Sequence, residues 1–144
     1  MAALAAMASA TAGCAPQRSV ESFCSTYWDE KTAYVDKYET AAEGVKATSE
    51  QEPLLGLLSG TAMIAQASGD VIVIFDKLDK VAPDDIEPDV AAIRDTLKSQ
   101  AEKAPGAVSD PLGTIVGGLV QGLMVSGSWQ RVGDYVVTNC GEQS

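Results

Sequence analysis

The stretch Val20-Glu21-Ser22-Phe23-Cys24-Ser25-Thr26-Tyr27-Trp28 begins the clearest periodic pattern in this sequence. From this stretch to Val45, apolar side chains return every three or four positions. They are Val20, Phe23, Cys24, Tyr27, Trp28, Tyr34, Val35, Tyr38, Ala41, Ala42 and Val45, with Lys31 on the same stripe between Trp28 and Tyr34. This spacing places them on one face of an α-helix, with charged residues on the opposite face. We expect a long helix with Ser19 as its N-cap, ending in the polar segment 48–53.

The next two segments show the same spacing. A second helix is predicted from about residues 49–53 to Val81. Its stretch Val71-Ile72-Val73-Ile74-Phe75 has the composition of a strand, but the helical spacing holds over a longer span. A third helix is predicted to follow the turn at 82–85, with Pro88 in its first turn. Its apolar face comprises Ile86, Val90, Ile93, Leu97 and Ala101.

Two further helical segments complete the pattern. One lies within residues 110–131, and the other runs from a capping Ser128 to Cys140, followed by Gly141. The sequence thus predicts an all-α fold, a four- to five-helix bundle over residues 20–141. Residues 142–144 are expected to form a short tail.

The segment 111–130 carries no charge and allows two interpretations. Its length and its glycines, spaced as in GxxxG motifs, fit a membrane span. Pro111, Gln121, Ser126 and Ser128 lower its hydropathy, which favours a buried helix that packs closely against its neighbours. We expect the buried helix and keep the membrane span as the alternative.

Composition excludes several classes of function. Twenty acidic and ten basic residues give a net charge of −10, which argues against nucleic acid and against electrostatic docking on anionic lipid. There is no histidine, so catalytic Ser/His or Cys/His pairs and His-ligated metals are excluded. The acidic cluster at 84–89 lacks the spacing of an EF-hand and is expected to stabilise a helix N-terminus. We expect no metal and no cofactor.

The uncharged N-terminal segment leads to Thr11-Ala12-Gly13-Cys14. This tetrapeptide resembles the lipobox of bacterial lipoproteins, although Thr11 stands where that family usually has Leu, Val or Ile. The resemblance implies a signal peptide over 1–13, its basic start lying upstream or trimmed. It also implies lipid on Cys14 and a tether over 14–19. An ordinary alanine-rich N-terminus is the alternative.

Three cysteines are present: Cys14, Cys24 and Cys140. If Cys14 carries lipid, an even remainder in an exported protein predicts one disulfide, Cys24–Cys140, joining the first and last helices. Two unpaired buried thiols, or a bond involving Cys14, remain the alternatives.

The pattern as a whole resembles the small helical envelope lipoproteins of Gram-positive actinobacteria. The resemblance rests on three stretches: Phe23-Cys24-Ser25-Thr26-Tyr27-Trp28, Ala82-Pro83-Asp84-Asp85-Ile86 and Tyr135-Val136-Val137-Thr138-Asn139-Cys140-Gly141. It implies a location on the outer face of the cell membrane. It implies no activity.

Three tyrosines on one side of the first helix, Tyr27, Tyr34 and Tyr38, are the candidate ligand-facing residues, although aromatics at this spacing are more often part of a core. The function expected from the sequence is therefore that of a non-catalytic, lipid-anchored envelope protein that binds a protein or a small ligand. A secreted protein without lipid is the alternative. An enzyme that uses acidic residues is a third hypothesis, which the sequence does not favour.

Overall fold

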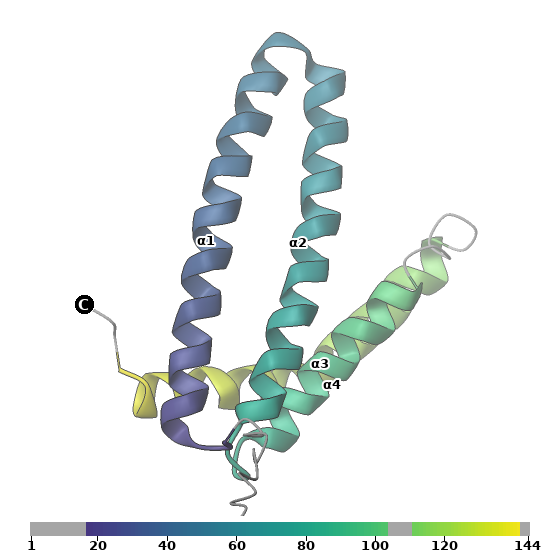
Figure 1. Cartoon of the computed structure of the whole chain (residues 1–144). Coiled ribbons are helices and arrows are strands. Elements are labelled where there is room, and N and C mark those ends of the chain that lie inside the picture. Colours follow the sequence, from purple (N-terminus) through teal and green to yellow (C-terminus); the bar gives the residue numbers. More distant parts are fainter. Residues whose placement is uncertain (1–16, 104–110, 142–144) are drawn as a thin grey trace, which may run out of the picture.

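The computed structural model describes residues 17–103 and 111–141, with the backbone alone for 111–124. The predicted signal peptide, Cys14 and the tail 142–144 lie outside this range. The described ranges contain four α-helices and no strand (Figure 1). They are α1 (Val20–Gln51), α2 (Pro53–Val81), α3 (Glu87–Lys103) and α4 (Pro111–Asn139). The predicted all-α fold is confirmed, and the strand-like stretch 71–75 is helical as expected.

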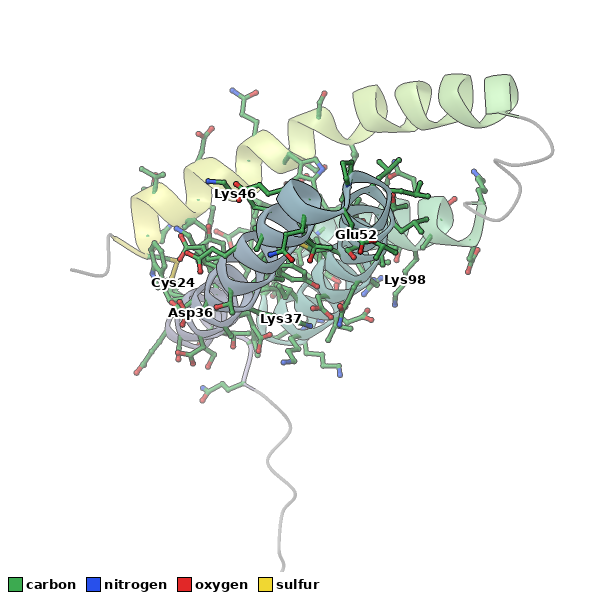
Figure 2. The ribbon with its side chains drawn as sticks, turned by 90° about the horizontal axis from the view of Figure 1, so that it is seen from above. Cys24, Asp36, Lys37, Lys46, Glu52 and Lys98 are labelled. Atoms are coloured by element: carbon green, nitrogen blue, oxygen red, sulfur yellow. A yellow bond between two sulfur atoms is a disulfide. The ribbon has the colours of Figure 1, made fainter. Side chains whose placement is uncertain are left out.

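The helices form two antiparallel pairs. α1 and α2 stand side by side as a long hairpin, which we call the arm. α3 and α4 form a second pair that leans away from α2, and the C-terminal part of α4 crosses the base of the arm (Figure 1). A view along the arm shows α4 as a long rod beside its base, with Cys24 near its C-terminal end (Figure 2).

The first three helices begin where the sequence predicts. The backbone N–H of Ser22 donates to Oγ of Ser19 at 3.1 Å, so Ser19 is the N-cap of α1. α2 begins at Pro53, and α3 places Pro88 in its first turn. Proline is favoured there because its missing N–H has no partner within the helix in any case.

The end of α1 differs from the prediction, since residues 48–51 continue the helix. The hydroxyls of Thr48 and Ser49 donate to backbone carbonyls four residues earlier, at 2.9 and 2.8 Å. Only Glu52 leaves helical geometry, with φ −138° and ψ 91°. The ring of Pro53 disfavours the helical region for the preceding residue, so the arm turns within one residue.

The last helix also differs from the prediction. A new helix was expected to begin at Ser128, but α4 continues without a break through this position. Ser128 is buried, and its Oγ accepts a hydrogen bond from Arg131 at 3.3 Å. No proline interrupts residues 112–139, so the backbone hydrogen bonds continue. The burial of 111–124, which bears on the membrane-span alternative, lies outside the described side chains.

The hydrophobic core lies at the base of the arm, where all four helices meet. Its buried members are Phe23, Phe75, Leu78, Val81, Ala82, Ile86, Val90, Ile93, Val125, Val132 and Val136. α1 supplies only Phe23 from its first turn, and α2 supplies residues from its last two turns. The hydrophobic core therefore lies at one end of the molecule, and the arm extends beyond it.

The predicted disulfide joins Cys24 to Cys140, with their Cα atoms 5.1 Å apart. Beside it, Nε1–H of Trp28 donates to the carbonyl of Cys140 at 3.4 Å. The rings of Phe23 and Tyr135 meet edge to face at 5.6 Å. The bond fastens the start of α1 to the end of α4, and the two helices cross there instead of lying side by side (Figure 1).

Candidate functional site

The distal half of α2 is apolar and lies open to solvent. Residues 53–69 carry no charged side chain. The side chains at its start, which we call the leucine tip, are between 48% and 70% exposed: Leu54, Leu55, Leu57 and Leu58. Ile64, two turns further along, is 64% exposed. Contiguous exposed apolar surface of this kind marks an interaction site in soluble proteins.

The tip is not covered by α3, because α3 is shorter than α2 and leans away from the arm (Figure 1). α2 has 29 residues and α3 has 17. The pairing of α3 with α2 is fixed near the base, where Arg94 binds Asp79 and Lys98 Nζ donates to Asp76 at 2.6 Å. The face of α2 that carries these contacts continues toward the tip by helical spacing. There, nothing in the described part of the chain lies over it.

An apolar cleft of about 560 Å³ lies where α3 separates from the arm. Its volume is within the range of small-molecule sites. α1, α2 and α3 all contribute to its lining. The lining residues are Tyr34, Tyr38, Met63, Ile64, Ala67, Ser68, Val71, Ile72, Leu97, Gln100 and Ala101. None of these is charged, and Ile64 connects the cleft with the bare face that leads to the leucine tip.

The structure separates the three tyrosines singled out in the sequence. Tyr34 and Tyr38 both line the cleft, with ring centroids 4.6 Å apart. Tyr27 lies nearer the base, packed against the core, and its ring meets that of Trp28 edge to face at 5.1 Å. The helical spacing placed all three on one side of α1, but only the distal two lie at the cleft.

A group of three polar residues lies behind the α1 side of the cleft, and Tyr38 connects it to the cleft lining. The hydroxyl of Tyr38 donates to Oδ2 of Asp70 at 2.7 Å, and Nζ of Lys37 binds the same oxygen. The hydrogen bond from Lys37, with that from Tyr38, lowers the pKa of Asp70. Burial, followed by the hydrogen bond to Asp70, raises the pKa of Tyr38. The hydrogen bond to Asp70 fixes the orientation of the Tyr38 ring.

A second hollow of about 200 Å³ lies against the arm and is lined by both charged and apolar side chains. It includes Lys37 and Asp70, together with Lys77, whose Nζ donates to Glu30 at 2.6 Å. These exposed ion pairs join α1 to α2. They account for the polar groups of this hollow without a ligand.

The acidic cluster at 84–89 is divided among separate roles. Glu87 faces Arg18 at 3.8 Å, and Asp89 binds Arg131 of α4. The hydrogen bond from Arg131 lowers the pKa of Asp89. No group of three or more acidic or cysteine side chains in the described part of the chain is arranged to hold a metal ion.

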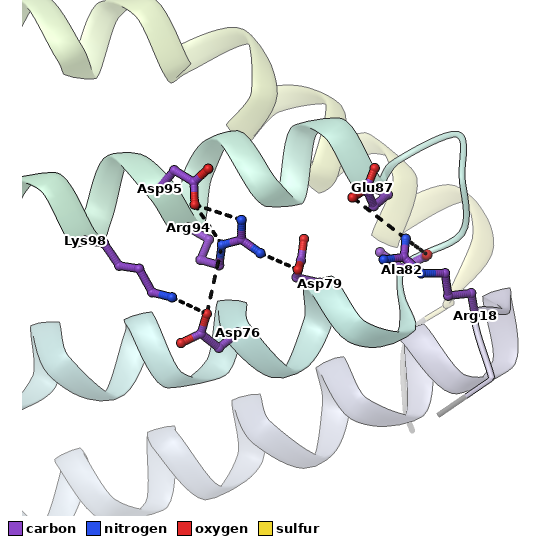
Figure 3. A network of polar contacts seen from close by, with 8 residues as sticks. All are labelled: Arg18, Asp76, Asp79, Ala82, Glu87, Arg94, Asp95 and Lys98. Carbon is purple, nitrogen blue, oxygen red and sulfur yellow. Dashed lines mark hydrogen bonds and ion pairs between the residues drawn. The ribbon is translucent and has the colours of Figure 1, made fainter. Parts of the chain in front are cut away.

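The largest polar network joins α2 to α3 (Figure 3). Arg94 lies among Asp76, Asp79 and Asp95, and Lys98 adds a second contact to Asp76. The hydrogen bond to Asp95 contributes most to the raised pKa of Arg94. These contacts hold α3 against the base of α2, and they leave Oδ1 of Asp79 buried without a hydrogen-bond partner.

The cleft can bind but carries no obvious reactive group. The polar side chains among its described lining residues are Tyr34, Tyr38, Ser68 and Gln100, which are neutral hydrogen-bonding groups. Sequence reasoning did not single out the leucine tip or Ile64. The signal was present, since an uncharged leucine-rich stretch directly follows a proline.

Comparisons with protein-family models, with curated proteins and with solved structures gave no match for this chain. By length and composition, one helix in the searched part of the chain, α2, is apolar enough to cross a membrane.

Proposed function

We propose that this chain is a non-catalytic envelope protein, anchored by lipid on Cys14, that binds an apolar partner in the cleft beside the arm. The observation that carries the binding role is the uncharged cleft of about 560 Å³, continuous with the bare face of α2. The anchor is supported by the lipobox-like residues before Cys14. The disulfide is in keeping with export, because such bonds persist in oxidising compartments.

The proposed anchor and the leucine tip belong to opposite ends of the arm. Ser19, five residues after Cys14, caps the start of α1. The tip follows the end of α1, which is 32 residues long and therefore spans about 48 Å at 1.5 Å per residue. An anchor at the base leaves the tip free to point away from the membrane. The partner is then reached in the envelope, at a distance from the lipid surface.

A membrane-inserted α2 is disfavoured by its neighbour. α1 packs along α2 and carries Asp36, Lys37, Lys46 and other charged residues along its length (Figure 2). Inserting α2 takes these side chains into the bilayer with it, at a cost of several kcal/mol for each charge near the centre. The arm is therefore better suited to an apolar partner in water.

Fatty-acid labelling tests the anchor. In an actinobacterial host, the wild-type chain is expected to take up label and to sediment with membranes, whereas Cys14→Ser is expected to be unlabelled and released. If Cys14→Ser stays with the membrane, the anchor is wrong, and a helix such as α2 or α4 must hold the protein there.

A neutral fluorescent probe, N-phenyl-1-naphthylamine, tests the cleft. The chain is expected to enhance its emission, and Ile64→Glu is expected to weaken binding about tenfold by placing a charge in the cleft wall. Val137→Glu is the matched control, because Val137 is 80% exposed on α4, away from the cleft. Equal probe binding by both variants would place the apolar site elsewhere.

A further inference from the structure

We infer that the partner in the cleft is a second copy of this chain, whose leucine tip enters the cleft while its own cleft receives the first copy's tip. This inference rests on the proposed binding role of the cleft. The inference adds the identity of the occupant. Each cleft is then complete only when the tip of the other copy fills it.

The chemistry of the two surfaces is complementary. The cleft offers apolar walls without a charged lining residue, so a suitable occupant must bring apolar side chains and no charge. The leucine tip is such a segment, because residues 53–69 are uncharged and its four leucines are at least 48% exposed. Leu54 of the tip and Ile72 of the cleft lie on one face of α2. Two copies related by a two-fold axis can therefore cover both at once.

The spacing along α2 supports an antiparallel arrangement. Leu54, Thr61, Ala65 and Ile72 lie on one face of the helix, because they are separated by seven, four and seven residues. A two-fold axis that crosses the two helices at the level of Met63 places Leu54 of one copy beside Ile72 of the other copy. Ile72 is one of the residues that line the cleft. The same axis sets Thr61 opposite Ala65, and these small side chains let the two helices approach closely where they cross.

The interface would be long enough for a specific dimer. The stretch from Leu54 to Ile72 extends about 27 Å along the helix at 1.5 Å per residue. A standard interface needs about 800 Å² from each partner, more than the leucines alone provide. The cleft walls from α1 and α3 contribute the remainder, so the proposed contact requires tip and cleft together.

The net charge of −10 gives this dimer a distinct salt dependence. Two acidic chains repel one another, and salt screens that repulsion with a Debye length of about 10 Å at 0.1 M. The apolar contact itself is not weakened by screening. Association between copies is therefore expected to tighten with added salt, whereas binding of a basic partner would weaken.

Light scattering after gel filtration tests the inference on the full chain carrying Cys14→Ser, so that no lipid drives association. The chain is expected to be dimeric at high micromolar concentration and to dissociate on dilution. Leu54→Glu in the tip and Ile64→Glu in the cleft wall are each expected to weaken the dimer about tenfold or more. Leu54 is 70% exposed and lies in the first turn of α2, where an acidic side chain is tolerated, so this variant should fold.

Val137→Glu is the matched control and should leave the dimer intact. A monomer at every concentration overturns the inference, as does a dimer that resists both Leu54→Glu and Ile64→Glu. If the chain is a monomer but still binds the neutral probe, the proposed binding role of the cleft stands. Only the inference that a second copy occupies the cleft is then wrong. If the monomer instead co-floats with phosphatidylcholine vesicles, the tip binds a lipid surface and the inference of a second copy is wrong.

Cross-linking tests the register. Chains carrying Leu54→Cys and chains carrying Ile72→Cys, both in the Cys14→Ser background, are mixed and oxidised. A mixed disulfide is expected to form faster than either variant forms a dimer with itself. A dimer without this mixed product would use another face and would overturn the inference.

Discussion

Gly56 of α2 packs directly on the backbone of Ser49 across the turn of the arm. A Cβ added to Gly56 would lie 2.5 Å from Cα of Ser49 and nearer still to its Oγ. Backbone atoms cannot move aside as a flexible side chain can, so only glycine allows α1 and α2 to meet this closely. Gly56 is also buried, although it lies between the exposed leucines of the tip.

Gly56→Ala is therefore expected to loosen the tip of the arm. Overpacking of this kind costs about 1–3 kcal/mol, against a gain of at most about 1 kcal/mol from replacing glycine within a helix. Urea unfolding should show a net loss of stability, and hydrogen exchange should quicken near the turn. Gly69→Ala is the matched control, because nothing lies within 4 Å of its added Cβ, so it should stabilise the chain by about 0.5–1 kcal/mol. Equal effects of the two variants would contradict the close approach at Gly56.

Helical spacing predicted the helices well because an apolar stripe of this length has few other interpretations. It predicted the ends of α2 and α4 to within a residue, but not the boundaries suggested by serine and threonine. Thr48 and Ser49 looked like a polar break, yet their hydroxyls bond to the preceding turn and the helix continues. Ser128 looked like a cap but is buried within α4. The local sequence does not distinguish a serine that caps a helix from a serine inside one. Tertiary packing decides which of the two conformations forms.

The site was only partly predictable for a related reason. Periodicity showed that Tyr27, Tyr34 and Tyr38 share a side of α1, but not how far the core extends along it. The core ends after the first turns of α1, so Tyr27 packs at the base while Tyr34 and Tyr38 reach the cleft. The width of that cleft depends on where α3 departs from α2, which no local pattern encodes.

The Cys24–Cys140 bond is expected to contribute much of the stability of the base. It closes a loop of 116 residues, for which chain entropy predicts about 4–5 kcal/mol. The double variant Cys24→Ser/Cys140→Ser should therefore unfold at much lower denaturant concentration. Mass spectrometry of the untreated chain should find no free thiol at either position. Unchanged stability in the double variant would show that the crossing of α1 and α4 is held by packing alone.

Arg94 is expected to matter more than its neighbour Lys98. Arg94→Leu leaves Asp79, whose side chain is only 17% exposed, without its cation, and should cost about 2 kcal/mol. Lys98→Leu removes a more exposed pair with Asp76 and should cost less than about 1 kcal/mol. Denaturant unfolding of the two variants decides the order. A larger loss for Lys98→Leu would contradict the central position of Arg94.

Asp89 is expected to make stability fall in acid. The hydrogen bond from Arg131 lowers the pKa of Asp89 in the folded chain below its unfolded value near 4. The folded state then binds fewer protons, so this contribution is present above pH 4 and is lost as the pH falls through the folded pKa. Asp89→Asn should flatten this part of the curve of unfolding free energy against pH. A curve for Asp89→Asn that is identical to the wild-type curve would count against the Asp89–Arg131 pair.

Two isoleucines distinguish the packed base from the bare arm. Ile93 is fully buried in the core, so Ile93→Ala should cost about 2–5 kcal/mol. Ile64 is 64% exposed, so in a dilute solution of monomers Ile64→Ala should change stability by less than about 0.5 kcal/mol.

At high concentration the two substitutions should behave differently. The cost of Ile93→Ala should stay constant, because its neighbours belong to the same chain. The cost of Ile64→Ala should rise with concentration if a second copy covers this face, since binding stabilises the folded state by mass action. A cost that stays small at every concentration would show that Ile64 faces water in the working protein.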